Sequence, residues 1–284
     1  MQLETLENFL HTKGKTLPSP LAVIFAEDTV ELAGTIAHHR TLGFGTILVV
    51  GELGELDPGI TKDVHVFPSD LDTLEDSVAI LNQIIKACEN AWIYYCFNAE
   101  YLFFPYCENR AIKDAIAFME EERRTSVFTY AIDLYPQNMN DHPNGVDLAT
   151  AHLDSNGYYG LNRFEDAEEL ERQTDIFGGL RWRFEEHIPW KKRRIDRISL
   201  FKALKGVKID TDLRLNTPEM NTIACPWHNN MTMSIMSFRV AKALMHNPGS
   251  ADEIHTFEWA GSQKFDWNSA QLLEMGFMEP GQWF

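Results

Sequence analysis

The stretch LAVIFA at residues 21–26 decides the fold, because a continuous apolar run of this length is typical of a strand buried in a parallel sheet. The runs TILVV (46–50) and AWIYYC (91–96) have the same character. Apolar residues at helical spacing separate them, over 29–42 and 73–89. Strand–helix–strand units at this pitch predict an α/β protein, with a mostly parallel sheet flanked by helices.

The same alternation continues along the chain. The further expected elements are a helix at 3–11, strands at 64–67 and 126–135, a helix at 109–122 and a C-terminal helix near 269–276. Thr73 is the expected N-cap of the helix at 73–89, because its hydroxyl can accept from a free backbone N–H of the first turn. In the helix at 29–42, Ala33 and Ala37 are expected on the apolar face, and Gly43 is expected to end it.

The second half of the sequence changes character at residue 136. Residues 136–175 are polar and contain many glycines and prolines, which predicts loops. We therefore expect a single domain over 1–284. Its α/β nucleotide-binding half would be 1–135, and 136–284 would form a loop-rich acceptor-side and C-terminal elaboration.

Charge narrows the classes of partner. The chain has 25 Lys+Arg and 42 Asp+Glu, a formal net charge of −17. Nucleic acids and anionic membranes bind basic surfaces, so neither is an expected partner. No apolar run approaches the roughly 20 residues of a membrane-spanning helix. The N-terminus MQLETLENFLHTKGK lacks the apolar core of a signal peptide, so we expect a cytoplasmic protein.

The four cysteines do not form a CxxC pair, so no zinc site is expected. We expect buried free thiols in a reducing compartment, with two disulfides as the alternative. The four are Cys88, Cys96, Cys107 and Cys225.

Acidic and amide side chains follow the expected strands, where open α/β sheets bind ligands. Glu27 and Asp28 come after 21–26, and Glu52 comes after 46–50. Glu27 and Asp28 also precede a helix and fit its dipole, so a role as helix caps is the favoured interpretation for these two residues, with ligand binding as the alternative.

Two further carboxylates lie in very apolar surroundings. Asn98 and Glu100 follow the strand at 91–96, and Asp133 lies inside the strand at 126–135. A carboxylate in such a run needs a partner, because burying an unpaired charge is costly. Glu100 and Asp133 are therefore as consistent with a catalytic role as with a structural one.

A local cationic region stands out in this acidic chain. Lys191–Arg194 is a contiguous basic run, with Arg181, Arg183 and Arg197 nearby. A contiguous run usually forms a solvated face, which is the favoured interpretation; a phosphate-bearing ligand is the alternative. His38-His39 is expected to be structural, whereas His228, in a loop after Pro226 and Trp227, is a candidate for binding.

Seven segments, taken in order, resemble the bacterial family-two-like glycosyltransferases of the GT-A fold. They are GTIAHHRTLGF (34–44), CFNAEYLFFP (96–105), AIDLYP (131–136), LDSNGYY (153–159), FGGLR (177–181), PWH (226–228) and MSFR (236–239). The resemblance implies a Rossmann-like sheet and transfer of a sugar from a nucleotide-sugar donor to a glycan or small-molecule acceptor.

The resemblance also implies a degenerate metal site. In that family a D-x-D pair and a late histidine hold Mn²⁺ or Mg²⁺ on the donor diphosphate. Here those positions fall on Phe97, Ala99 and Ser237, and only the trailing acid is retained, as Glu100. We therefore expect no metal site and no cofactor; Asn98 with Glu100 leaves weak binding of a divalent metal open.

Two functional hypotheses follow. In the first, the protein is an active transferase in which Asp133 or Glu100 deprotonates an acceptor hydroxyl. The expected substrate-binding residues are Glu27, Asp28, Glu52 and Asn98, with Arg181, His228 and Arg239 offsetting the diphosphate charge. In the second, a catalytically inactive GT-A-like protein acts in binding or assembly. Nucleotide-sugar binding discriminates between them, and homo-oligomer formation is left open.

Overall fold

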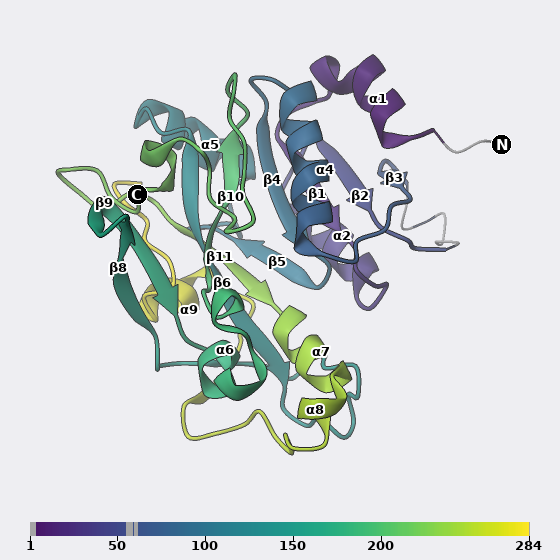
Figure 1. The fold of residues 1–284 in the computed structure, drawn as a ribbon, viewed down its shortest axis with the longest axis vertical. Helices are drawn as coiled ribbons and strands as arrows, with labels where there is room; N and C mark the ends of the chain where they lie inside the picture. The colour runs from purple at the N-terminus through teal and green to yellow at the C-terminus, as the bar shows by residue number, and fades with distance from the viewer. Residues whose placement is uncertain (1–3, 55–58, 60–61, 284) are drawn as a thin grey trace. The chain divides into compact units, whose positions relative to one another are not determined.

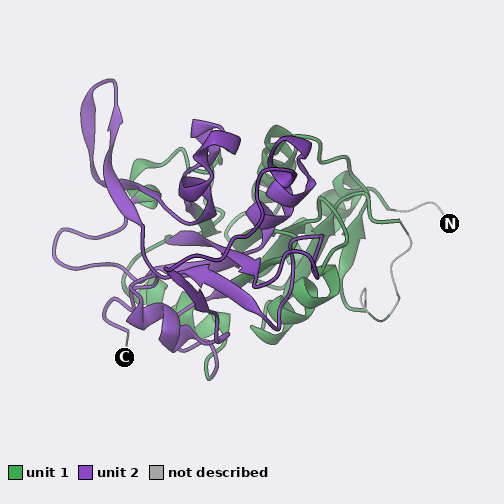
Figure 2. Cartoon of the chain, turned by 90° about the horizontal axis from the view of Figure 1, so that it is seen from below, with its two compact units in different colours: residues 1–101, 109–127, 198–221 green, residues 102–108, 128–197, 222–284 purple. Residues whose placement is uncertain are grey.

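The structure is a computed structural model that describes residues 4–54, 59 and 62–283. The chain divides into two compact units, which are interleaved along the sequence (Figure 2). Unit 1 comprises Met1–Tyr101, Asn109–Val127 and Ile198–Asn221, and unit 2 comprises Leu102–Glu108, Phe128–Arg197 and Thr222–Phe284. The single domain with halves 1–135 and 136–284 stays a prediction.

Unit 1 contains the parallel strands that the apolar runs predict (Figure 1). These strands are β1 (Leu21–Phe25), β2 (Thr46–Val50), β3 (His65–Phe67) and β4 (Trp92–Phe97). β1 pairs in parallel with β2 and β4, and β2 pairs in parallel with β3. Antiparallel to β4 runs β10 (Asp196–Lys202), through residues 200–202. The chain is thus a mixed α/β protein with a mostly parallel sheet, as predicted.

The helices that the structure describes in unit 1 include α1 (Leu6–Lys13), α2 (Leu32–Thr41), α4 (Leu74–Ala87) and α5 (Ile112–Glu121). Thr73 caps α4 as predicted: its Oγ1 accepts from the N–H of Asp76, whose carboxylate accepts from the N–H of Thr73. Gly43 follows α2 with a φ of 87°, in the left-handed region where glycine ends helices.

The helix predicted at 29–42 begins later than expected, at Leu32. Val30 N–H donates to Asp28 Oδ1, and Glu31 has a φ of 60°, so a capped turn precedes α2. The face expected to be apolar is also rotated: Ala33 and Ala37 are exposed. The buried face carries Leu32, Thr35, Ile36 and His39, because Thr35 and His39 satisfy their polar atoms locally.

Unit 2 is built on β6 (Ser126–Pro136), which pairs in parallel with β11 (Met233–Ser237). β7 (Ala151–Asp154) runs antiparallel to β6, and β12 (Ser262–Lys264) runs antiparallel to β7. The helices are α6 (Leu180–Arg183), α7 (Arg239–His246), α8 (Pro248–Ala251) and α9 (Ser269–Glu274). β5 (Glu100–Phe103) runs from unit 1 into unit 2.

Residues 136–175 contain more strand than the loop-rich prediction expected. Besides β7, this region contains β8 (Tyr159–Glu165), and β9 (Glu168–Phe177) follows it in an antiparallel hairpin (Figure 1). The hairpin is a separate two-stranded sheet. Nearly every residue of β8 is exposed, so no alternation of apolar and polar residues marks the strand in the sequence.

The structure shows the state of the cysteines. All four cysteines are free thiols, with Cys88 and Cys96 buried and Cys107 and Cys225 half-buried.

Within the described part of the chain, no helix combines the length and the apolarity that crossing a bilayer requires.

Candidate functional site

The strand ends of unit 1 meet at one edge, as the sequence predicts. Phe25 of β1 lies opposite Val50 of β2 and Phe97 of β4. The segments that carry Glu27, Asp28, Glu52 and Asn98 therefore leave neighbouring strands at the same level. Glu27 and Glu52 are exposed there. A hydrogen bond with Asp70 raises the pKa of the Glu52 carboxyl.

Asn98 serves the fold of this edge rather than an open surface. Its side chain is buried, and its Nδ2 donates to the carbonyl oxygens of Asp28 (2.8 Å) and Val30 (2.7 Å) and to Asp28 Oδ1 (2.9 Å). Its Oδ1 accepts from the N–H of Ala99. The amide thus fastens the turn after β1 to the end of β4, and Asp28 is the turn's cap.

The retained acid, Glu100, is also buried in unit 1. Its Oε2 accepts from the backbone N–H of Phe97 at 2.8 Å. Phe97 and Ala99 are buried beside it. Among residues 4–54, 59 and 62–283, no group of three or more His, Cys, Asp or Glu side chains has the arrangement to hold a metal ion.

Asp133 lies at the end of β6 in unit 2 and has the partner that burial demands. Its side chain is 0% exposed, and Oδ1 lies 3.2 Å from Nε of Arg181. The Arg181 N–H also donates to Oδ2 at 3.3 Å. Burial raises the pKa of Asp133 to about 6, with Arg181 acting in the opposite direction. The charge of Arg181 is therefore already compensated within the fold.

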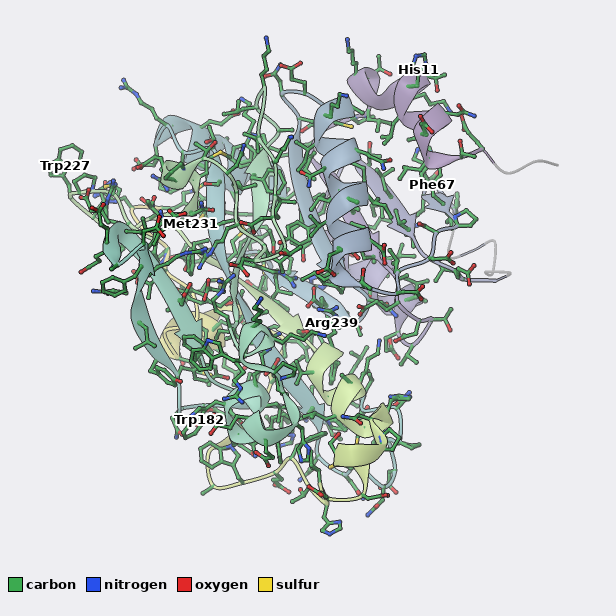
Figure 3. The ribbon with its side chains drawn as sticks, viewed as in Figure 1. His11, Phe67, Trp182, Trp227, Met231 and Arg239 are labelled. Atoms are coloured by element: carbon green, nitrogen blue, oxygen red, sulfur yellow. The ribbon has the colours of Figure 1, made fainter. Side chains whose placement is uncertain are left out.

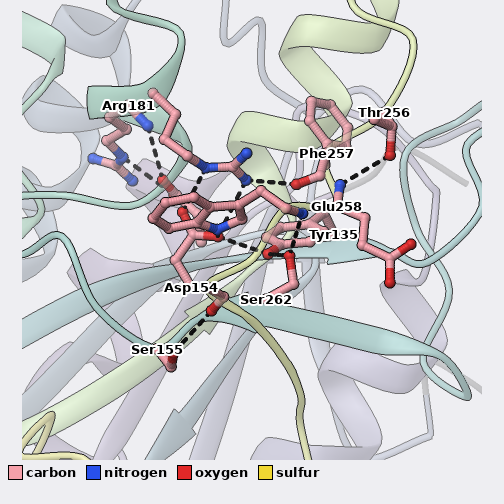
Figure 4. Close-up of polar contacts among 12 residues, drawn as sticks. Tyr135, Asp154, Ser155, Arg181, Thr256, Phe257, Glu258 and Ser262 are labelled. Carbon is pink, nitrogen blue, oxygen red and sulfur yellow. Dashed lines mark hydrogen bonds and ion pairs between the residues drawn. The ribbon is translucent and has the colours of Figure 1, made fainter.

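A second buried ion pair, Asp154 with Arg183, lies in the same unit (Figure 4). Asp154 Oδ2 accepts from Arg183 Nε at 2.8 Å. Asp154 Oδ1 accepts from Arg183 Nη2 (3.1 Å), Tyr135 Oη (2.6 Å) and Trp259 Nε1 (2.8 Å). One carboxylate thus gathers donors from β6, α6 and the loop before β12.

Two glycines bring the pairs together. A Cβ on Gly178 would lie 2.2 Å from Cδ1 of Tyr158, and one on Gly179 would lie 3.0 Å from Asp133 Oδ2 and 3.4 Å from Tyr158 Oη. Glycine is therefore required at these two positions, because any side chain there would collide with Tyr158 or crowd Asp133. We call Asp133, Asp154, Tyr158, Arg181 and Arg183 the carboxylate–arginine cluster.

Tyr158 Oη is buried in this cluster and, among the residues that the structure describes, has no hydrogen-bond partner. Burial, with Asp154 and Asp133 nearby, raises the pKa of Tyr158 well above its usual value, so the hydroxyl keeps its proton. An unpaired buried hydroxyl of this kind is uncommon and costs stability.

The solvated-face interpretation of Lys191–Arg194 is confirmed for Lys191 and Lys192, which are exposed. It is wrong for Arg193 and Arg194, which are half-buried in ion pairs with Glu185 and Asp175. The neighbouring arginines are also part of the packed fold: Arg181 and Arg183 pair with buried carboxylates, and Arg197 is itself buried.

His228 and Arg239 do not belong to the cluster. His228 is half-buried in a loop whose neighbouring Trp227 is 88% exposed, and Arg239 begins α7. Trp227 and Arg239 lie far apart in Figure 3. Their assignment to the diphosphate stays a prediction.

Sequence reasoning missed Asp154, Arg183 and Tyr158 as members of a site. Two signals were available: LDSNGYY contains Asp154 and Tyr158, and FGGLR directly precedes Trp182-Arg183. Neither segment shows by itself which acid pairs with which arginine, because that depends on the pairing of β6 with β7.

Comparisons with known proteins gave little similarity. No family model matches the sequence, and no curated protein matches it. The crystal structure of S. aureus TarS 1-349 in complex with UDP matches with a TM-score of 0.26 and 17% identity, over 40% of this chain and 35% of that one. A second structure of S. aureus TarS matches with a TM-score of 0.27 and 16% identity, over 40% of this chain and 21% of that one.

This chain thus matches about a third or less of the length of the TarS chains. At these TM-scores the similarity carries no argument about activity.

Proposed function

We propose that this protein is a glycosyltransferase that moves a sugar from a nucleotide-sugar donor to a hydroxyl of a glycan or small-molecule acceptor. One observation carries the proposal. Three of the seven segments that resemble family-two-like glycosyltransferases (131–136, 153–159 and 177–181) fold into one cluster. Segments that are matched by chance have no reason to supply neighbouring side chains.

Asp133 is the proposed general base. A carboxyl with a pKa of about 6 is mostly ionised at pH 7, yet it is a stronger proton acceptor than an ordinary aspartate. Arg181 positions it through two hydrogen bonds. The side chain is fully buried, and Gly179 and Arg181 lie against it, so we propose that this segment moves to admit the acceptor. Glu100, held by the Phe97 N–H, is the less suitable base.

The donor is proposed to lie at the edge formed by the ends of β1, β2 and β4. Glu27 and Glu52 offer exposed acceptors there, while Asp28 and Asn98 shape the turn. By the resemblance, Phe97, Ala99 and Ser237 fall at the positions of the family's metal ligands, so we propose transfer without that metal site. His228 and Arg239 remain the proposed cationic groups for the diphosphate.

A thermal-shift screen of UDP-, GDP- and dTDP-sugars, with EDTA and with Mn²⁺, tests this function. A ligand at 100 times its Kd stabilises the fold by about 2.7 kcal/mol. Stabilisation that survives EDTA is expected, with transfer or donor hydrolysis lost in Asp133→Asn and retained in Glu7→Gln, a control in α1. Stabilisation only with Mn²⁺ would contradict the metal-free arrangement, and no response to any donor would favour the inactive binding protein.

A further inference from the structure

Three aromatic rings are stacked at the base of the β8–β9 hairpin. Tyr159 lies opposite Phe177 across the two strands, with ring centroids 5.4 Å apart and planes 19° from parallel. Phe177 stacks in turn on Trp190, at 5.1 Å and 22°. Phe177 is 6% exposed, whereas Tyr159 is 41% and Trp190 59% exposed. We call these three residues the aromatic row; its two outer rings are open to solvent.

Trp190 is held in a fixed orientation. One face of the indole packs on Phe177, and the residue is still 59% exposed. The Arg193 guanidinium carbon lies 5.7 Å from the indole centroid. Arg193 is itself held by Glu185 Oε2 (2.7 Å) and by the carbonyl oxygen of Ile188 (2.8 Å). An exposed ring that is already ordered loses little entropy when a ligand binds.

The chain connects the aromatic row directly to the carboxylate–arginine cluster. Tyr158 of the cluster precedes Tyr159, and Gly178-Gly179 follow Phe177. The hairpin that these segments frame extends from the rest of unit 2 (Figure 2). A ligand bound at the aromatic row would therefore contact Tyr159 and the segment at Phe177. These two segments continue directly into Tyr158 and into the Gly178–Arg181 turn of the cluster.

The aromatic row has the chemistry of a surface that binds saccharides. A pyranose ring has a flat face of C–H groups and a rim of hydroxyls. An exposed indole or phenol ring matches the face, and the Arg193–Glu185 pair beside it offers donors and acceptors to the rim. The local charges are mixed, because the exposed Lys191 and Lys192 follow Glu185 in the chain and the β9 strand carries the exposed Glu168 and Glu169, so no single sign of charge favours a charged ligand.

We propose that Trp190 and Tyr159 form a binding surface for a neutral oligosaccharide, the acceptor side of the transfer. This inference rests on the proposed function for the word acceptor, whereas the surface itself is an independent claim. Tyr159 and Trp190 are binding residues here, and Phe177 positions both.

Calorimetric titration of the full chain with gluco- and chito-oligosaccharides tests the proposal. Binding is expected to weaken at least tenfold in Trp190→Ala, to recover in Trp190→Phe, which restores the stack on Phe177, and to weaken in Tyr159→Ala. Trp227→Ala is the matched control, because Trp227 is also an exposed tryptophan and lies outside the aromatic row, on the loop 225–229. Thermal unfolding identifies any variant that fails to fold.

Two results would overturn the surface: no oligosaccharide binds the intact chain, or Trp227→Ala weakens binding as much as Trp190→Ala. The nucleotide-sugar screen separates the two proposals. Donor binding without oligosaccharide binding removes only the surface. Oligosaccharide binding without donor binding supports the surface and contradicts the transferase.

Discussion

Arg183 Nε lies 2.8 Å from Oδ2 of Asp154, and the two side chains are only 12% and 1% exposed. Asp154 is also the acceptor for Tyr135 Oη and Trp259 Nε1. Removing one member of a buried ion pair costs about 3–5 kcal/mol, because the other charge is left uncompensated. The pair is therefore a structural anchor of unit 2, whatever the cluster does chemically.

Asp154→Ala is accordingly expected to lose about 3–5 kcal/mol in free energy of unfolding, measured by urea denaturation. Glu219→Gln is the matched control. Its ion pair with Arg124 leaves the Glu219 side chain 59% exposed, so a loss below about 1 kcal/mol is expected. Equal losses in the two variants would show that Asp154 is not the anchor.

Two buried tyrosines of unit 2 should respond oppositely to loss of the hydroxyl. Tyr135 Oη bonds to Asp154 and lies 2.8 Å from Ser262 Oγ, so Tyr135→Phe is expected to lose about 1.5–3 kcal/mol. Tyr158 Oη has no partner among the described residues, so Tyr158→Phe is expected to retain or gain stability. A comparable loss in Tyr158→Phe would indicate an ordered water or a further partner at that hydroxyl. Urea unfolding of both variants decides the matter.

The strands of unit 1 could be predicted from the sequence because they are buried on both faces, so unbroken apolar runs mark them. The capped start of α4 was equally predictable, since Thr73 and Asp76 interact within one turn. The start and the apolar face of α2 were not, because the polar residues Thr35 and His39 are buried there through local hydrogen bonds.

The candidate site could be predicted only in part. Asp133 was identified because an acid inside an apolar strand needs a partner. The partner was not, because Arg181 is 48 residues away in the sequence and belongs to a basic region that resembles a solvated face. Arg183 and Asp154 are separated by 29 residues and had the same difficulty. Such pairs are set by strand pairing, which short patterns do not encode.

Asp133 should make the protein less stable as the pH rises. Its folded pKa of about 6 lies above the unfolded value of about 3.9, so the folded state holds the proton more tightly. The cost of ionisation is absent below about pH 4, develops up to about pH 6 and is complete above it, amounting to about 3 kcal/mol. Relative to Asp133→Asn, the wild type should therefore lose stability between pH 4 and 7. Parallel curves of unfolding free energy against pH would contradict this assignment.

His39 should act in the opposite direction in the same pH range. It is buried, its Nδ1 donates to the carbonyl oxygen of Thr35 at 2.8 Å, and its ring stacks on Tyr94. Burial, with a smaller contribution from His38, lowers its pKa to about 3. Below about pH 6.5 His39 becomes protonated in the unfolded chain but stays neutral in the folded chain. The free energy of unfolding therefore falls as the pH drops from 6.5 towards 3, by up to about 1.4 kcal/mol per pH unit. His39→Gln should flatten this dependence, whereas His11→Gln, at an exposed position, should not.

Because Asp133 and His39 oppose each other between pH 4 and 6, the wild-type curve alone hides both effects. The double variant Asp133→Asn/His39→Gln should approximate the sum of the two single changes, since His39 contacts Thr35 and Tyr94 whereas Asp133 pairs with Arg181.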